Sequence, residues 1–173
     1  MSDNTFVYPS HRNVSDMSIK NFEVGYNLKL VATTEDSKIH PSSVYGITKQ
    51  VQEQLVMSVC PNLGIKPVSL RYQNVYGPGQ SLVNPYTGIL SIFSSLILND
   101  SQVNIFEDGL ESRDFVYIDD VVTATISCLE NENADNQIFN IGSGVPTSVE
   151  QVANYLYQNY NKKPNYEISG NFR

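Results

Sequence analysis

The sequence predicts an α/β fold in which helices and strands alternate along a single domain. Apolar residues recur at helical spacing in four stretches, and short apolar runs of strand character lie between them. The 173 residues, 40% of them hydrophobic and 17% charged, suffice for one well-buried domain and are few for two. Because no internal repeat or linker divides the chain, we treat residues 1–173 as one domain.

The first clear element is a helix after a long irregular segment. Residues 1–40 are polar, and only a short strand around Tyr26–Val31 is expected there. Pro41-Ser42-Ser43 then offers a serine cap ahead of apolar residues that recur at helical spacing over Val44–Val59. Pro61 ends this helix, because proline cannot continue the hydrogen-bond pattern.

The remaining elements follow in alternation. The predicted strands are 66–72, 103–106, 114–118, 138–141 and 166–169, and the predicted helices are 89–98, 121–129 and 149–160. Asp119 or Asp120 is expected to cap the helix at 121–129. Ser148, which is followed by a glutamate, is expected to cap the helix at 149–160. The loop over 73–88 contains Gly77-Pro78-Gly79, and loops of this length are more often functional than idle.

Composition and charge exclude several classes of function. A formal net charge of -7 argues against a nucleic-acid binder, which normally presents a basic face. Cys60 and Cys128 lie in apolar helical patterns without paired spacing, so buried reduced thiols are expected. His11 and His40 stand alone, so no metal site is expected. Neither a signal peptide nor an apolar run long enough for a membrane span is found, and a cytoplasmic protein is expected.

The most informative feature is Tyr45-Gly46-Ile47-Thr48-Lys49. Residues four apart on a helix share a face, so the phenol of Tyr45 and the ammonium of Lys49 are expected to point into the same space. A cation fixed beside a phenol favours the phenolate, which is a useful base near neutral pH. The spacing alone indicates little, since it would occur about 0.4 times by chance in a chain with 11 tyrosines and seven lysines.

Five motifs in a fixed order add weight to this pair. They are PSSVYGITKQVQEQL, SLRYQNVYGPGQS, NPYTGILSIF, IFEDGLESRDFVYIDDV and FNIGSG. Together, from about residue 35 to residue 173, they resemble the extended short-chain dehydrogenase/reductase family. Within it the chain looks most like the NAD-dependent nucleotide-sugar epimerases of the UDP-glucose 4-epimerase and dTDP-rhamnose 4-epimerase kind. The resemblance implies a Rossmann-like fold, of which this chain would hold the second half of the parallel sheet and part of the substrate-binding region.

The resemblance implies the reaction and the residues at its centre. Tyr45 would take the proton from a sugar hydroxyl while hydride passes to NAD, and Lys49 would bind the nicotinamide ribose. The keto sugar would then rotate and take the hydride back on its other face, which regenerates NAD. Gln73 would face the nicotinamide, at a position where the family commonly has an aromatic residue.

The same resemblance implies a set of substrate-binding residues for a UDP- or dTDP-linked sugar. They are Asn74, Asn84, Asn104, Phe106 and Arg113. Arg113 has a physical argument of its own, because a pyrophosphate needs a fork of donors and a guanidinium supplies one. The alternative for Arg113 is a surface ion pair with Glu111 or Asp114. The alternative role for Asn74 is an amide that caps a turn. Arg71 belongs to the same strand-end motif as Asn74, and its alternative role is a structural salt bridge.

Two features of the family are not found in the sequence. The GxxGxxG turn that approaches the cofactor pyrophosphate is missing, and the motif that Phe172-Arg173 would open is not continued. We therefore expect an internal segment of a longer enzyme. In this segment residues 1–40 would resemble an insertion, and 41–173 would form the catalytic helix and the substrate-binding region.

Alternatives to a 4-epimerase remain. One is a nucleotide-sugar 4,6-dehydratase, and another is a non-catalytic remnant that dimerises or binds nucleotide sugars. The resemblance also implies a homodimer, through the helices Tyr45–Val59 and Ile89–Leu98.

Overall fold

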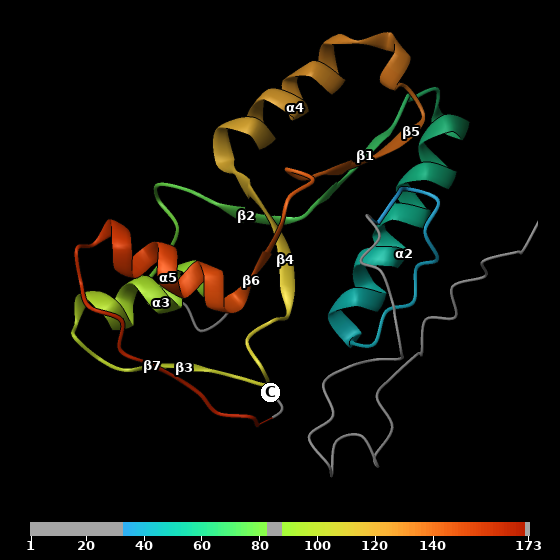
Figure 1. The fold of residues 1–173 in the computed structure, drawn as a ribbon. Coiled ribbons are helices and arrows are strands. Elements are labelled where there is room, and N and C mark those ends of the chain that lie inside the picture. The colour runs from blue at the N-terminus through green and yellow to red at the C-terminus, as the bar shows by residue number, and fades with distance from the viewer. Residues whose placement is uncertain (1–32, 83–87, 172–173) are drawn as a thin grey trace, which may run out of the picture.

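The computed structural model describes residues 33–82 and 88–171, and it confirms the α/β class (Figure 1). The expected strand at 26–31 lies outside these residues. The helices are α2 (Val44–Val59), α3 (Ile89–Leu98), α4 (Ile118–Glu130) and α5 (Val149–Asn159), with short 3-10 turns η1 (Cys60–Leu63) and η2 (Glu132–Ala134). The strands are β1 (Val68–Tyr72), β2 (Asn74–Tyr76), β3 (Val103–Ile105), β4 (Ser112–Tyr117), β5 (Gln137–Ile141), β6 (Pro146–Ser148) and β7 (Tyr166–Ile168).

The strands form three small sheets. In the first, β1 and β5 run parallel, with Arg71 opposite Asn140. In the second, β4 lies between a parallel β2 and an antiparallel β6. In the third, β3 and β7 run parallel. The chain crosses from the first sheet to the second twice, at Gln73 between β1 and β2 and at residues 142–145 between β5 and β6.

Helix α2 begins and ends where the sequence predicts. The hydroxyl of Ser43 accepts a hydrogen bond from the backbone N–H of Gly46 at 3.1 Å, which caps the first turn. After η1 the chain reverses at Gly64, whose φ of 73° is a left-handed conformation that glycine adopts without strain. Strand β1 therefore returns alongside α2 in the opposite direction.

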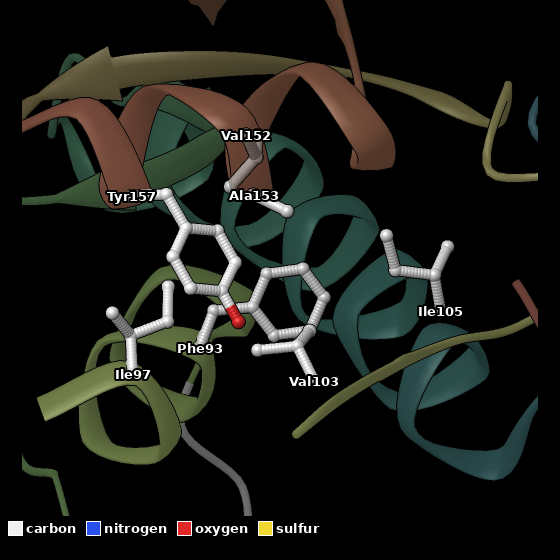
Figure 2. Close-up of a cluster of buried hydrophobic side chains, with 7 residues drawn as sticks. All are labelled: Phe93, Ile97, Val103, Ile105, Val152, Ala153 and Tyr157. Carbon is white, nitrogen blue, oxygen red and sulfur yellow. The ribbon is translucent and has the colours of Figure 1, made fainter. Parts of the chain in front are cut away.

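The main buried cluster lies between α3, β3 and α5 (Figure 2). Its members are Phe93, Ile97, Val103, Ile105, Val152, Ala153 and Tyr157. Burial of each large aliphatic or aromatic side chain contributes about 1.5–3 kcal/mol. The hydroxyl of Tyr157 donates to the carbonyl of Asn165 at 2.6 Å, so its polar end is satisfied. The apolar side of α3 is thus buried within the chain. A dimer surface was expected on Ile89–Leu98, but only Ile92 and Leu98 of this helix are exposed large hydrophobic residues.

Helix α5 starts with a capping box. The Ser148 hydroxyl accepts from the backbone N–H of Gln151 at 3.1 Å, and the Gln151 side chain accepts from the Ser148 N–H at 2.8 Å. The expected serine cap is confirmed, but its reciprocal partner is Gln151 rather than a glutamate, because Gln151 occupies the third helical position. The carboxylate of Glu150 instead accepts a hydrogen bond from the Tyr166 hydroxyl at 2.9 Å.

The expected cap of α4 is wrong. The helix begins at Ile118 directly after β4, its N-cap position is Tyr117, and no side chain caps it. Because strand and helix follow without a linker, Asp119 and Asp120 fall inside the first turn. Their negative charges there are favourable toward the positive end of the helix dipole.

The two cysteines, Cys60 and Cys128, are free and half-buried. Within 33–82 and 88–171, no group of three His, Cys, Asp or Glu side chains is placed to hold a metal ion. None of the helices in this part of the chain has the length and apolar character needed to cross a membrane.

Candidate functional site

Tyr45 and Lys49 lie on one face of α2, as the spacing predicts. The Lys49 Nζ is 5.5 Å from the centroid of the Tyr45 ring. Both side chains are exposed, with 72% of Tyr45 accessible to solvent. Lys49 also donates to the Gln52 side-chain oxygen at 3.2 Å, which uses one of the three donors of its ammonium group. The pair is therefore open to a ligand that accepts hydrogen bonds.

The helix that carries this pair is fixed to the first sheet by Arg71. Its guanidinium binds the carboxylate of Glu53, in the middle of α2, so the structural salt bridge weighed for Arg71 is present. Tyr45 lies eight residues before Glu53, which is about 12 Å along a helix. Since α2 runs opposite to β1 (Figure 1), the first turn of α2, which carries Tyr45, lies toward the carboxyl end of β1 and β5. Ligands of open α/β sheets bind at this edge.

A cleft of about 660 Å³ lies where the first and second sheets meet. Its lining comes from the two crossings between the sheets, from the start of β2, from β4, from the end of β5, from the start of β6 and from Thr33. The lining residues are Thr33, Gln73, Asn74, Ser112, Arg113, Asp114, Asn140, Gly142, Gly144 and Pro146. Three predicted site residues, Gln73, Asn74 and Arg113, thus meet in one cleft of a size suited to a small molecule.

Arg113 lines this cleft and also forms the surface ion pair with Glu111 that was considered as its alternative role. It donates to the Glu111 carboxylate and, at 3.3 Å, to the carbonyl of Ser112. The side chains of Arg113 and Glu111 are 46% and 47% exposed. Exposed pairs of this kind contribute at most about 1 kcal/mol, so the guanidinium can exchange Glu111 for an anionic ligand at little cost. Asn74 donates its side-chain N–H to the carbonyl of Asp114 at 3.0 Å.

The other predicted residues do not join this cleft. Asn84 lies outside the described residues. Asn104 is exposed on β3, on the face opposite the buried Val103 and Ile105, and Phe106 follows it. Neither lines the cleft, because β3 belongs to the third sheet. Tyr45 and Lys49 also lie outside its lining.

Residues 33–35 form one edge of the cleft by binding Asn140 on β5. The backbone N–H of Asn140 donates to the Glu35 carboxylate at 2.7 Å, and its side-chain N–H donates to the Thr33 carbonyl at 2.9 Å. The hydrogen bond from the Asn140 backbone is the main reason that the pKa of Glu35 lies below its usual value.

Sequence reasoning missed the role of Asp114. It considered this residue only as an ion-pair partner of Arg113, whereas the carboxylate accepts hydrogen bonds from Ser143 and Gly144. Burial raises the pKa of Asp114, but the bonds from Ser143 and Gly144 outweigh it, and the pKa lies below its usual value. A signal was present, because a Gly-Ser-Gly turn after an apolar strand offers backbone N–H groups to an anion.

Comparison with known proteins identifies the group to which this arrangement is similar. Residues 25–142 match the family model described as NAD dependent epimerase/dehydratase family. The dTDP-L-rhamnose 4-epimerase of Burkholderia thailandensis is 38% identical over 99% of this chain and 47% of its own length. The chain thus spans about half the length of that curated relative, and 37% of a UDP-glucose 4-epimerase-like one from Methanocaldococcus jannaschii.

Solved structures give the same result. The UDP-glucose 4-epimerase of Thermotoga maritima, with UDP-glucose, superposes with a TM-score of 0.72 and 40% identity over 83% of this chain and 46% of its own. The UDP-glucuronic acid 4-epimerase of Bacillus cereus, in complex with UDP-glucuronic acid and NAD, gives a TM-score of 0.72 and 33% identity over 83% and 45%. These neighbours confirm the Rossmann-like fold expected from the motifs.

Proposed function

The chain belongs to the NAD dependent epimerase/dehydratase family, and on that premise we propose that it carries the catalytic residues of a nucleotide-sugar 4-epimerase. The observation that supports this most is the open Tyr45–Lys49 pair toward the carboxyl edge of β1, in a chain whose cleft gathers Gln73, Asn74 and Arg113. The substrate would be a UDP- or dTDP-linked hexose, as in the relatives.

Tyr45 and Lys49 act together in this proposal. Tyr45 takes the proton from the hydroxyl at C4 of the sugar and returns a proton after the ring has turned. Lys49 holds its side-chain nitrogen 5.5 Å from the centroid of the Tyr45 ring, so both side chains can contact the same ligand. Lys49 also has donors for the ribose hydroxyls of NAD. Gln73 follows the end of β1 and lines the cleft, where it would face the nicotinamide. NAD supplies hydride acceptance and return, so it is not consumed.

Arg113 and Asn74 bind the substrate in this proposal. The guanidinium offers a planar fork to the diphosphate, and the diphosphate replaces Glu111 as its partner. Asn74 lies across the same cleft and offers its amide to a sugar or ribose hydroxyl. Pairing of β2 with β4 places Asn74 opposite Phe115, and pairing of β4 with β6 places Arg113 opposite Thr147.

We also infer a cytoplasmic homodimer that associates through α2. Its apolar stripe remains between 44% and 78% exposed in the single chain, and contiguous exposed apolar surface marks protein contacts. The stripe consists of Val44, Ile47, Val51, Leu55 and Val59. The two free thiols, Cys60 and Cys128, fit a reducing compartment.

The test combines binding with turnover. The purified chain is titrated calorimetrically with UDP-glucose and with dTDP-L-rhamnose, and C4 inversion in the presence of NAD is followed by proton NMR. We expect Arg113→Ala to weaken nucleotide-sugar binding about tenfold or more. Tyr45→Phe should keep binding and lose turnover about 100-fold or more. The control is Tyr155→Phe, an exposed tyrosine on α5, which should change neither.

Two outcomes would contradict the proposal. If the unmodified chain binds neither nucleotide sugar, the assignment of the cleft is wrong. If it binds one of them, with loss in Arg113→Ala, but neither binds NAD nor inverts the sugar, the non-catalytic alternative replaces the enzyme.

A further inference from the structure

We propose that Asp114 is a positioning residue of the cleft: its carboxylate holds the Gly142–Gly144 turn against β4 and thereby sets where Arg113 and Asn74 meet the nucleotide sugar. This inference rests on the proposed function of the cleft. It adds a residue that itself lines the cleft, but whose carboxylate is occupied by the turn and acts through its neighbours Arg113 and Asn74.

The carboxylate is surrounded by donors from one turn. Its Oδ1 accepts from the backbone N–H of Ser143 at 2.7 Å and from the Ser143 hydroxyl at 2.8 Å. Its Oδ2 accepts from the backbone N–H of Gly144 at 2.9 Å. All three partners are donors, so an ionised carboxylate, which only accepts, matches them well. Hydrogen bonds to a charged acceptor are about twice as strong as neutral ones.

The turn is also packed tightly on Asp114. A Cβ atom at Gly142 would lie 2.5 Å from the Asp114 Oδ2 and 2.9 Å from the Gln73 Cγ. Only glycine therefore permits this approach without displacing the side chain of Asp114 or Gln73. The end of β5 is thereby fixed against both Asp114 and Gln73.

Asp114 connects the two places where the chain crosses between sheets. Its carboxylate holds the crossing after β5, and its carbonyl accepts the side chain of Asn74, just after the crossing at Gln73. It pairs across the second sheet with Pro146, next to Arg113 and its partner Thr147. Loss of the carboxylate bonds would release one wall of the cleft from the strand that carries Arg113.

The test compares Asp114→Asn with the wild-type chain. Asparagine has nearly the same shape, but its amide NH₂ would face one of the donors of the turn. We expect the amide protons of Ser143 and Gly144, observed by NMR, to exchange at least tenfold faster. The affinity for UDP-glucose or dTDP-L-rhamnose, measured by calorimetry, should fall about tenfold. The matched control is Asp135→Asn, which removes an aspartate whose ion pair with Lys66, at 2.6 Å, lies away from the cleft lining.

A double-mutant cycle separates positioning from general destabilisation. If Asp114 acts through Arg113, Asp114→Asn should cost little further affinity when Arg113 is already alanine. Ser143→Ala, which removes a single donor and keeps the carboxylate, should lower the affinity about threefold in the same direction. This variant decides the matter if Asp114→Asn does not fold, because circular dichroism can verify its native structure.

The outcomes are distinct. Wild-type affinity in Asp114→Asn, or in a Ser143→Ala chain when the former is unfolded, overturns the inference and leaves the proposed function intact. An equal loss when Arg113 is alanine and when Asn74 is alanine also overturns it, because the effect would then pass through neither residue. No nucleotide-sugar binding by the unmodified chain overturns the proposed function, and this inference with it.

Discussion

Arg71 binds Glu53 through two hydrogen bonds at once, from Nε to Oε2 at 2.8 Å and from Nη2 to Oε1 at 2.7 Å. The side chains are only 23% and 13% exposed. The Ser69 hydroxyl donates to the same carboxylate at 3.2 Å, and the third nitrogen of Arg71 donates to the carbonyl of Glu35 at 2.9 Å. Since β1 carries Arg71 and α2 carries Glu53, this network fixes the helix of Tyr45 against the sheet.

Replacement of Glu53 by glutamine should lower the free energy of unfolding by about 2 kcal/mol, because the half-buried guanidinium loses two charge-assisted hydrogen bonds. Urea unfolding followed by circular dichroism measures the change. Glu130→Gln, at the exposed end of α4, should stay within about 0.5 kcal/mol of wild type. Equal losses in the two variants would show that the pair with Arg71 contributes nothing specific.

The same pair should make stability depend on pH. The hydrogen bonds from Arg71 lower the pKa of Glu53 below its usual 4.5 despite partial burial. A pKa that is lower in the folded state adds stability above the unfolded value, and this stability is lost as the pH falls toward the folded value. The stability difference between wild type and Glu53→Gln should therefore be full above about pH 4.5 and shrink below it. A difference that stays constant in unfolding series down to about pH 3 would contradict this account.

The capping box of α5 gives a separate stability prediction. Ser148→Ala removes the acceptor for the Gln151 N–H and should cost about 1 kcal/mol. For a chain of this size, that corresponds to a fall in Tm of about 3 °C. Ser148→Thr, which keeps a capping hydroxyl, should retain most of the stability. If alanine and threonine melt together, the hydroxyl does not cap the helix in solution.

The proposed homodimer predicts a difference between two exposed leucines. Leu55 on the α2 stripe is 56% exposed and Leu129 on α4 is 81% exposed. We expect Leu55→Glu to convert the dimer to a monomer in sedimentation, because a charge would enter an apolar contact. Leu129→Glu should stay dimeric. A wild-type monomer, or dissociation by Leu129→Glu alone, would rule out the α2 interface.

Long periodic elements could be predicted from the sequence, whereas short strands could be predicted only in part. The bounds of α2 and α3 match their predictions because several turns of apolar spacing and clear stop residues define them. Strands β2 and β6 were not predicted, because β2 lies in the loop expected over 73–88 and β6 lies next to the Gly142–Gly144 turn. Strands β3 and β7 are equally short and were predicted at 103–106 and 166–169. The cap of α4 was mistaken because nothing local reveals that β4 runs straight into the helix.

Site residues that belong to sequence motifs could be predicted. Roles that depend on contacts between distant segments of the chain could not. Gln73, Asn74 and Arg113 were named from motifs, and they meet in the cleft. The role of Asp114 depends on a turn 29 residues later in the chain, a contact that no local spacing encodes. Asn104 was named by the same resemblance, but the pairing of β3 with β7 places it in another sheet.

Buried side chains are concentrated away from α2, and this should make the stability of α2 depend on bound ligand. The seven residues of the cluster in Figure 2 come from α3, β3 and α5, whereas α2 contributes no buried residue. Apart from the Glu53–Arg71 pair, little holds α2 in place, and segments with few buried contacts open locally at lower free-energy cost than a packed core. A ligand that bridges Tyr45 and Arg113 would supply the missing contacts, and at 100 times its Kd it would add about 2.7 kcal/mol to stability. Protection of α2 from proteases would then follow the concentration of ligand, so that substrate and cofactor act as part of the folded structure.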